Sequence, residues 1–168
     1  MLQRFLLSVL FINGFANTLL AQQQGQNGTA TVITQRPTRN LFVELGGAGM
    51  IMTFNYDQRF TKSDVGIGGR IGIGGFALPE NDHLVAIPVG INYLMGKNGK
   101  YFEIGAGATY FGGNAILDDT NEVMGNLVFG YRRQPEDGGF MFRAGLTPFF
   151  NHETFIPYVG HLSFGYTF

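Results

Sequence analysis

The chain has 168 residues, with 11 Lys and Arg against 12 Asp and Glu and no cysteine. This length suits one domain, the near-neutral charge excludes the basic surface that nucleic acid requires, and the missing thiols exclude disulfides, Cys-ligated metals and a lipidated N-terminal Cys. Glycine is abundant at 26 residues and charged residues reach only 14%, against about 25% in typical soluble domains, while 17 Phe and 7 Tyr require a packed or lipid-facing environment.

The N-terminal segment, residues 1–21, predicts a secretory signal peptide. Arg4 supplies the positive start, an apolar run covers residues 5–12, and Ala21 ends a plausible cleavage site. The run is much shorter than the roughly 20 residues of a membrane-spanning helix. Residues 22–39 are rich in Gln, Gly, Asn and Thr, which predicts a flexible periplasmic lead-in.

From Asn40 to Phe168 the chain alternates between apolar and small or polar residues, which is the period of a β-strand. In the clearest case Val85, Ile87, Val89, Ile91 and Tyr93 share one face. Short turns such as Lys97-Asn98-Gly99-Lys100 alternate with longer polar connections, and a tight turn is expected at residues 46–49. The pattern predicts eight strands, at residues 40–47, 50–60, 65–76, 84–95, 101–111, 123–134, 140–150 and 156–168.

The face opposite the apolar rows is mostly Gly, Ala, Thr and Ser, which would make a poor water-exposed surface. We therefore expect the apolar face to meet lipid and the glycine-rich face to line a narrow interior. Aromatic residues support this orientation, because membrane barrels carry an aromatic girdle at each interface. The expected periplasmic girdle comprises Phe60, Tyr93, Phe102, Tyr131, Phe140, Phe142, Tyr166 and Phe168, and the opposite one Phe76, Tyr110, Phe111, Phe149, Phe150, Phe155 and Tyr158.

At the C-terminus Leu162, Phe164, Tyr166 and Phe168 alternate, and the sequence ends on Phe. With the signal segment and eight strands, residues 40–168 resemble the small OmpA/OmpX-type outer-membrane β-barrel family. The resemblance implies an all-β, eight-stranded antiparallel up-and-down transmembrane barrel. It also implies that the four C-terminal residues are the signal read by the barrel assembly machinery. The chain departs from that signal in carrying Ser163 where Gly is frequent.

Seven charged residues fall on the inward register: Glu44, Asp57, Arg59, Arg70, Glu103, Arg132 and Arg143. Buried charges must be paired. Two interpretations follow, a gated ion path and an ionic plug that fills the barrel and fixes strand register. The packed interior of eight-stranded barrels favours the plug.

Three weaker motifs point to other chemistry. His161-Leu162-Ser163 resembles the His-x-Ser of outer-membrane lipid A deacylases, but no acidic partner follows it. The glycines of residues 72–77 match a dinucleotide fingerprint without the helix it needs. Asp118, Asp119, Asn121 and Glu122 lack a full calcium pattern. We expect no catalytic residue, no metal and no cofactor.

The sequence thus predicts a non-enzymatic barrel of the Gram-negative outer membrane, with a structural role or a role in loop-mediated surface interaction. Its expected partners are outer-membrane lipid, lipopolysaccharide and the assembly machinery, and we expect a monomer. A deacylase-like, lipid-modifying enzyme and a narrow channel for small solutes are the alternatives.

Overall fold

The computed structural model describes residues 36–77, 83–113 and 121–168. The predicted signal segment lies outside the described residues, as does most of the predicted lead-in. Among the described residues, no helix is long and apolar enough to cross a membrane.

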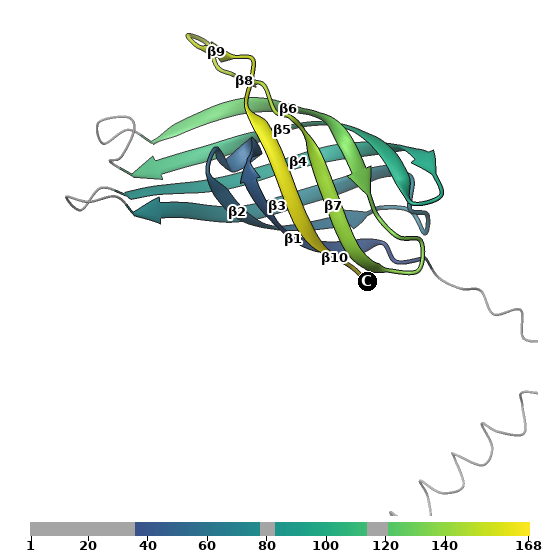
Figure 1. The fold of residues 1–168 in the computed structure, drawn as a ribbon. Coiled ribbons are helices and arrows are strands. Elements are labelled where there is room, and N and C mark those ends of the chain that lie inside the picture. Colours follow the sequence, from purple (N-terminus) through teal and green to yellow (C-terminus); the bar gives the residue numbers. More distant parts are fainter. Residues whose placement is uncertain (1–35, 78–82, 114–120) are drawn as a thin grey trace, which may run out of the picture. The chain divides into compact units, whose positions relative to one another are not determined.

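The described chain forms one closed antiparallel β-barrel (Figure 1). Each long strand pairs with its neighbour in sequence, β1 closes against β10, and a ladder joins β5 to β6. The predicted all-β, eight-stranded, up-and-down architecture is therefore confirmed. The eight long strands are β1 (Arg39–Gly46), β2 (Met52–Arg59), β3 (Gly66–Ala77), β4 (His83–Lys97), β5 (Lys100–Gly113), β6 (Glu122–Arg133), β7 (Gly139–Leu146) and β10 (Gly160–Thr167).

The two ends of the barrel differ. The turn end carries the short connections at residues 60–65, 98–99 and 134–138, together with both described chain ends. There the amide of Arg39 donates to the carbonyl of Phe168 at 3.1 Å, and the amide of Phe168 donates back at 2.9 Å. The loop end carries the other connections. The barrel wall is taller on one side, because strands β3 to β6 have 12 to 15 residues whereas β1, β2, β7 and β10 have 8.

The tight hairpin between β4 and β5 forms at the predicted Asn-Gly pair. Asn98 and Gly99 have φ of 57° and 72°, which is the left-handed geometry of the turn that matches strand twist. Lys97 pairs with Lys100 directly beside it.

The prediction that residues 140–150 form one continuous seventh strand is wrong. The segment breaks after Leu146 into β7 and the two-residue β8 (Phe149–Phe150), which pairs with β9 (Phe155–Ile156). Because Pro148 has no amide hydrogen, it contributes only its carbonyl, which accepts from Leu127 at 3.0 Å. β8 pairs with Gly125 and Asn126 of β6 and so stays joined to the barrel wall. The hairpin that β8 forms with β9 projects beyond the wall (Figure 1). The predicted eighth strand accordingly begins only at Gly160.

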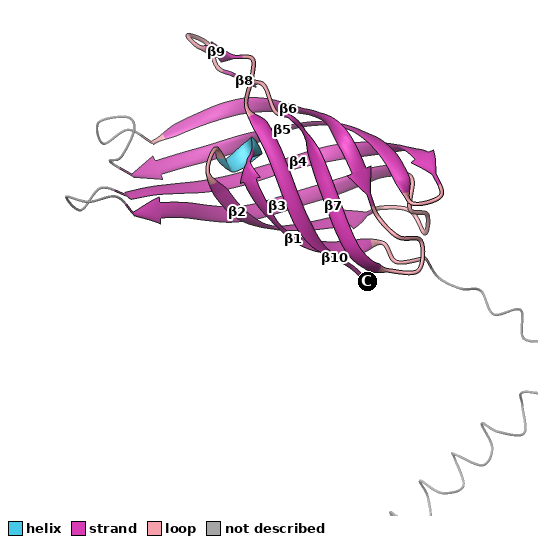
Figure 2. Cartoon of the chain, viewed as in Figure 1, coloured by secondary structure: helices cyan, strands magenta, loops and turns pink. Residues whose placement is uncertain are grey.

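The connection after β1 is more than a tight turn. Residues Gly47–Gly49 form the 3₁₀ turn η1, which folds inward into the mouth of the barrel (Figure 2). Ala48 is fully buried, and its carbonyl accepts the Thr109 hydroxyl at 2.7 Å. The turn therefore packs inside the lumen near the loop end.

Strand alternation sorts the side chains as expected, with the apolar rows outward and the glycine-rich rows inward. Ile71, Ile73, Val89 and Ile91 are all exposed on the isolated barrel, and Ile91 retains 61% of its accessible surface. In the expected periplasmic girdle, at the turn end, only Phe142 is half-buried, and the other seven aromatic residues are exposed.

Two residues expected in the girdle of the loop end face the interior instead. Phe111 and Phe149 are 3% and 0% exposed, and their ring centroids lie 5.9 Å apart. Each has an aromatic neighbour in sequence, Tyr110 or Phe150, and adjacent strand residues must face opposite sides. With Leu84, Ala86 and Met124 they form an apolar cluster inside the barrel near the loop end.

Candidate functional site

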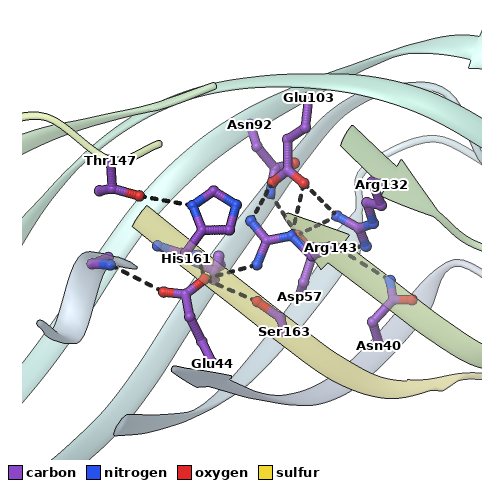
Figure 3. A network of polar contacts seen from close by, with 12 residues as sticks. Asn40, Glu44, Asp57, Asn92, Glu103, Arg132, Arg143, Thr147, His161 and Ser163 are labelled. Atoms are coloured by element: carbon purple, nitrogen blue, oxygen red, sulfur yellow. Dashed lines mark hydrogen bonds and ion pairs between the residues drawn. The ribbon is translucent and has the colours of Figure 1, made fainter. Parts of the chain in front are cut away.

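The seven charged residues predicted for the interior all lie there, on six different strands, and each is buried. They form one network of ion pairs and hydrogen bonds across the barrel (Figure 3). Because successive strand residues alternate sides, a charged residue in the inward register has only this interior to occupy.

The half of the network nearer the loop end is centred on Arg143 of β7. Its guanidinium donates to Glu103 twice, from Nε to Oε2 and from Nη2 to Oε1, both at 2.8 Å. Its Nη1 donates to Glu44 at 3.1 Å, and Arg70 donates to the same Glu44 oxygen at 3.0 Å. The Phe42 ring lies under the Arg143 guanidinium at 4.7 Å. One cation thus joins strands β1, β5 and β7.

The half nearer the turn end is centred on the fully buried Asp57. Arg132 donates to its Oδ1 at 2.9 Å, and Arg59 donates to its Oδ2 at 3.0 Å. Asn92 donates to Oδ2 at 2.6 Å and Asn40 to Oδ1 at 3.2 Å. Six hydrogen bonds from four side chains, counting the second contacts of Arg59 at 3.2 Å and of Arg132 at 3.4 Å, leave this carboxylate fully coordinated.

A contact of 3.6 Å between Arg132 and Glu103 connects the two halves. A small cavity of about 10 Å³ lies among Arg70, Asn92, Glu103 and Asn126. A single water needs at least about 10–15 Å³. The network is therefore tightly packed around these four residues.

The turn end has its own ionic contact outside the strands. Asp64, in the connection between β2 and β3, accepts Arg36 at 2.8 Å and also accepts the Tyr101 hydroxyl. Burial acts to raise the pKa of Asp64, but the hydrogen bonds from Tyr101 and Arg36 outweigh it and hold that pKa below its ordinary value. This contact fastens the residues before β1 to the barrel.

The His161 and Ser163 side chains both face the lumen, but they do not contact each other. Ser163 donates to Glu44 at 3.3 Å, while Nδ1 of His161 lies 3.0 Å from the Thr147 hydroxyl. Nucleophilic catalysis needs the serine within hydrogen-bond reach of its base. The described residues therefore do not form a serine–histidine pair.

Sequence reasoning missed several polar members of the network. Asn92 belonged to the inward row of its strand, so alternation was sufficient to find it. Asn40 lies at a strand end, and alternation placed Ser163 inward without indicating its contact with Glu44. The four residues of the predicted C-terminal signal, by contrast, form an exposed outward row on and just after β10: Leu162, Phe164, Tyr166 and Phe168.

Comparison with known proteins gives the fold alone. No family model and no curated protein matches the chain. Among solved structures, the chain is similar to the N-terminal β-barrel domain of OprF from Pseudomonas aeruginosa, with a TM-score of 0.53 and 16% sequence identity over 80% of this chain and 98% of that one. At this identity the similarity establishes a shared closed antiparallel barrel.

Proposed function

We propose that this chain is an integral outer-membrane β-barrel protein without catalytic activity. The observation that carries the proposal is a continuous apolar belt on the outer wall. Every long strand exposes large aliphatic or aromatic side chains outward. Monomeric soluble proteins rarely expose contiguous apolar patches above a few hundred Å².

The distribution of charge supports the same setting. Arginine, lysine and carboxylate side chains on the strands either face the lumen or lie at strand ends, as Arg39, Lys97, Lys100 and Arg133 do. In the strands that the structure describes, the middle of the outer wall carries none of them. A hydrocarbon layer requires this pattern, because a charge at the bilayer midplane costs several kcal/mol.

Neither alternative function receives specific support. The separate partners of His161 and Ser163 disfavour a deacylase, and the cavity of about 10 Å³ inside the network disfavours an open path for solutes. The proposed role is therefore structural or exerted through the loops. The proposal includes a monomer in contact with outer-membrane lipid and lipopolysaccharide, a signal peptide at residues 1–21, and assembly through the C-terminal row by the barrel assembly machinery.

A pair of arginine substitutions tests the membrane setting. Ile91→Arg places a charge at the middle of β4, and Phe60→Arg places one just beyond β2 at the turn end. Both native side chains are about equally exposed, at 61% and 66%. In a bilayer the first should cost about 2–4 kcal/mol of folding free energy and the second about 0–1 kcal/mol.

The readout is reversible urea unfolding in phospholipid vesicles, followed by the heat-dependent electrophoretic shift of a closed barrel. In a soluble protein both exposed positions would accept arginine within about 0.5 kcal/mol. Equal and small costs for the two variants, with a native protein that stays soluble without detergent, would overturn the proposal.

A further inference from the structure

Outside the lumen, the charges of this nearly neutral chain separate by end. Among the described residues at the loop end, the acidic ones are Glu122, the first residue of β6, and Glu153, and none of these described residues is Lys or Arg. The turn end has six basic residues, Arg36, Arg39, Lys62, Lys97, Lys100 and Arg133, against three acidic ones, Asp64, Glu136 and Asp137. The turn end is therefore the positive end.

Three of these cations lie together on neighbouring strands. Lys97 pairs across the hairpin with Lys100, and Lys100 pairs with Arg133 of β6. All three are exposed, and none makes an ion pair within the described part of the chain. The carboxylate of the nearby Glu136 lies 3.3 Å from the guanidinium of Arg36, and this ion pair offsets part of the negative charge of Glu136. The cluster therefore has positive charge available for a ligand.

The cluster borders a groove at the turn end. The groove has a volume of about 340 Å³ and is lined by Asn98, Gly99, Lys100, Arg133, Pro135 and Glu136. Two residues further along the same strands, Phe102 pairs with Tyr131, and both are exposed on the outer wall. A ligand here would meet cations at one end and aromatic rings at the other.

We propose that Lys100 and Arg133, assisted by Lys97, bind the phosphate headgroup of an anionic phospholipid whose acyl chains lie over Phe102 and Tyr131. An arginine and a lysine suit a phosphate diester, since the guanidinium can donate two parallel hydrogen bonds and the ammonium adds a point charge. The site rests on the proposed membrane function, and it belongs to the leaflet that the turn end faces.

The test is native mass spectrometry of the full barrel in neutral detergent, titrated separately with phosphatidylglycerol, zwitterionic phosphatidylcholine and inorganic phosphate. The variant Lys100→Gln/Arg133→Gln removes the site. The matched control, Arg39→Gln/Lys62→Gln, removes the same charge from exposed positions on the same rim outside the groove. The exchange Lys100→Arg/Arg133→Lys retains the charge.

We expect one saturable phosphatidylglycerol site in the native barrel and roughly 30-fold weaker binding in the site variant, as two cations at a membrane surface would produce. The control and the exchange variant should bind within about threefold of the native protein, a difference below 1 kcal/mol. Equal losses in the site variant and the control, or equal binding of phosphatidylcholine, would overturn the site. Displacement by equimolar inorganic phosphate would assign it to free phosphate instead.

The outcome is separate from that of the membrane proposal. The heat-dependent electrophoretic shift is recorded for each variant before titration, and it reports barrel closure whether or not lipid binds. Variants that keep the shift but bind normally refute only the headgroup site.

Discussion

Removing the central cation of the lumen should have a large and specific effect on stability. Arg143→Met keeps a long unbranched side chain but deletes three charge-assisted hydrogen bonds, two to Glu103 and one to Glu44. Both carboxylates are buried, so water cannot replace the lost donors at low cost.

The size of the expected loss in folding free energy depends on the hydrogen bonds that are deleted and on the ion pairs that remain. Three such hydrogen bonds at about 1.5–3 kcal/mol each set an upper limit of roughly 5–9 kcal/mol. Glu44 keeps Arg70 at 3.0 Å, and Glu103 keeps Arg132 at 3.6 Å, so neither carboxylate is left without a cation. We therefore expect a loss of about 3–5 kcal/mol, the usual cost of removing one partner from a buried ion pair.

The assay is equilibrium urea unfolding in phospholipid vesicles, with Lys62→Met as the control. Lys62 is exposed in the turn after β2 and makes no ion pair among the described residues, so its substitution should change stability by less than about 0.5 kcal/mol. The double variant Arg143→Met/Glu103→Gln should recover part of the loss, because it also removes the buried carboxylate that has lost its two hydrogen bonds from Arg143. If Arg143→Met proved as mild as the control, the network would not stabilise the barrel.

Three further outcomes are expected. In the folded protein the pKa of Asp64 lies below the ordinary value of about 3.9. Its ionised form therefore stabilises the fold at neutral pH, and this contribution disappears as pH falls below about 4. Asp64→Asn should flatten the acid side of a profile of stability against pH, measured by urea unfolding. Gly165→Ala should impair refolding, because a Cβ at this position would lie 2.2 Å from a backbone carbonyl oxygen. In the same strand, a Cβ at position 160 would have no neighbouring atom closer than 4.0 Å, so Gly160→Ala should refold normally in a gel-shift assay. Thr109→Val removes the hydroxyl that donates to Ala48, which should cost about 1–3 kcal/mol; planar-bilayer recordings should show rare openings in this variant and steady closure in the native barrel.

Alternation alone was sufficient to predict much of this structure. A strand has a strict two-residue period, so the apolar rows and the inward charges could be assigned to faces without knowing which strands pair. The hairpin turn was also predictable from local sequence, because the backbone at Asn98 and Gly99 adopts the left-handed geometry that these residue types tolerate. Strand number, the outward apolar rows and all seven charged lumenal positions followed from these short-range rules, whereas Phe111 and Phe149 were assigned to the wrong face.

Local patterns could not determine which residues meet across the barrel. Period two assigns a face, but the contact of Arg143 with Glu103 depends on the stagger of β7 against β5 around the closed wall. The inward fold of Gly47–Gly49 likewise depends on a hydroxyl from distant Thr109, and the contact between the Phe111 and Phe149 rings depends on β5 and β8 both pairing with β6. Face is a property of neighbouring residues along the chain, whereas pairing, lumen closure and the interior cluster are properties of strands brought together by the closed sheet.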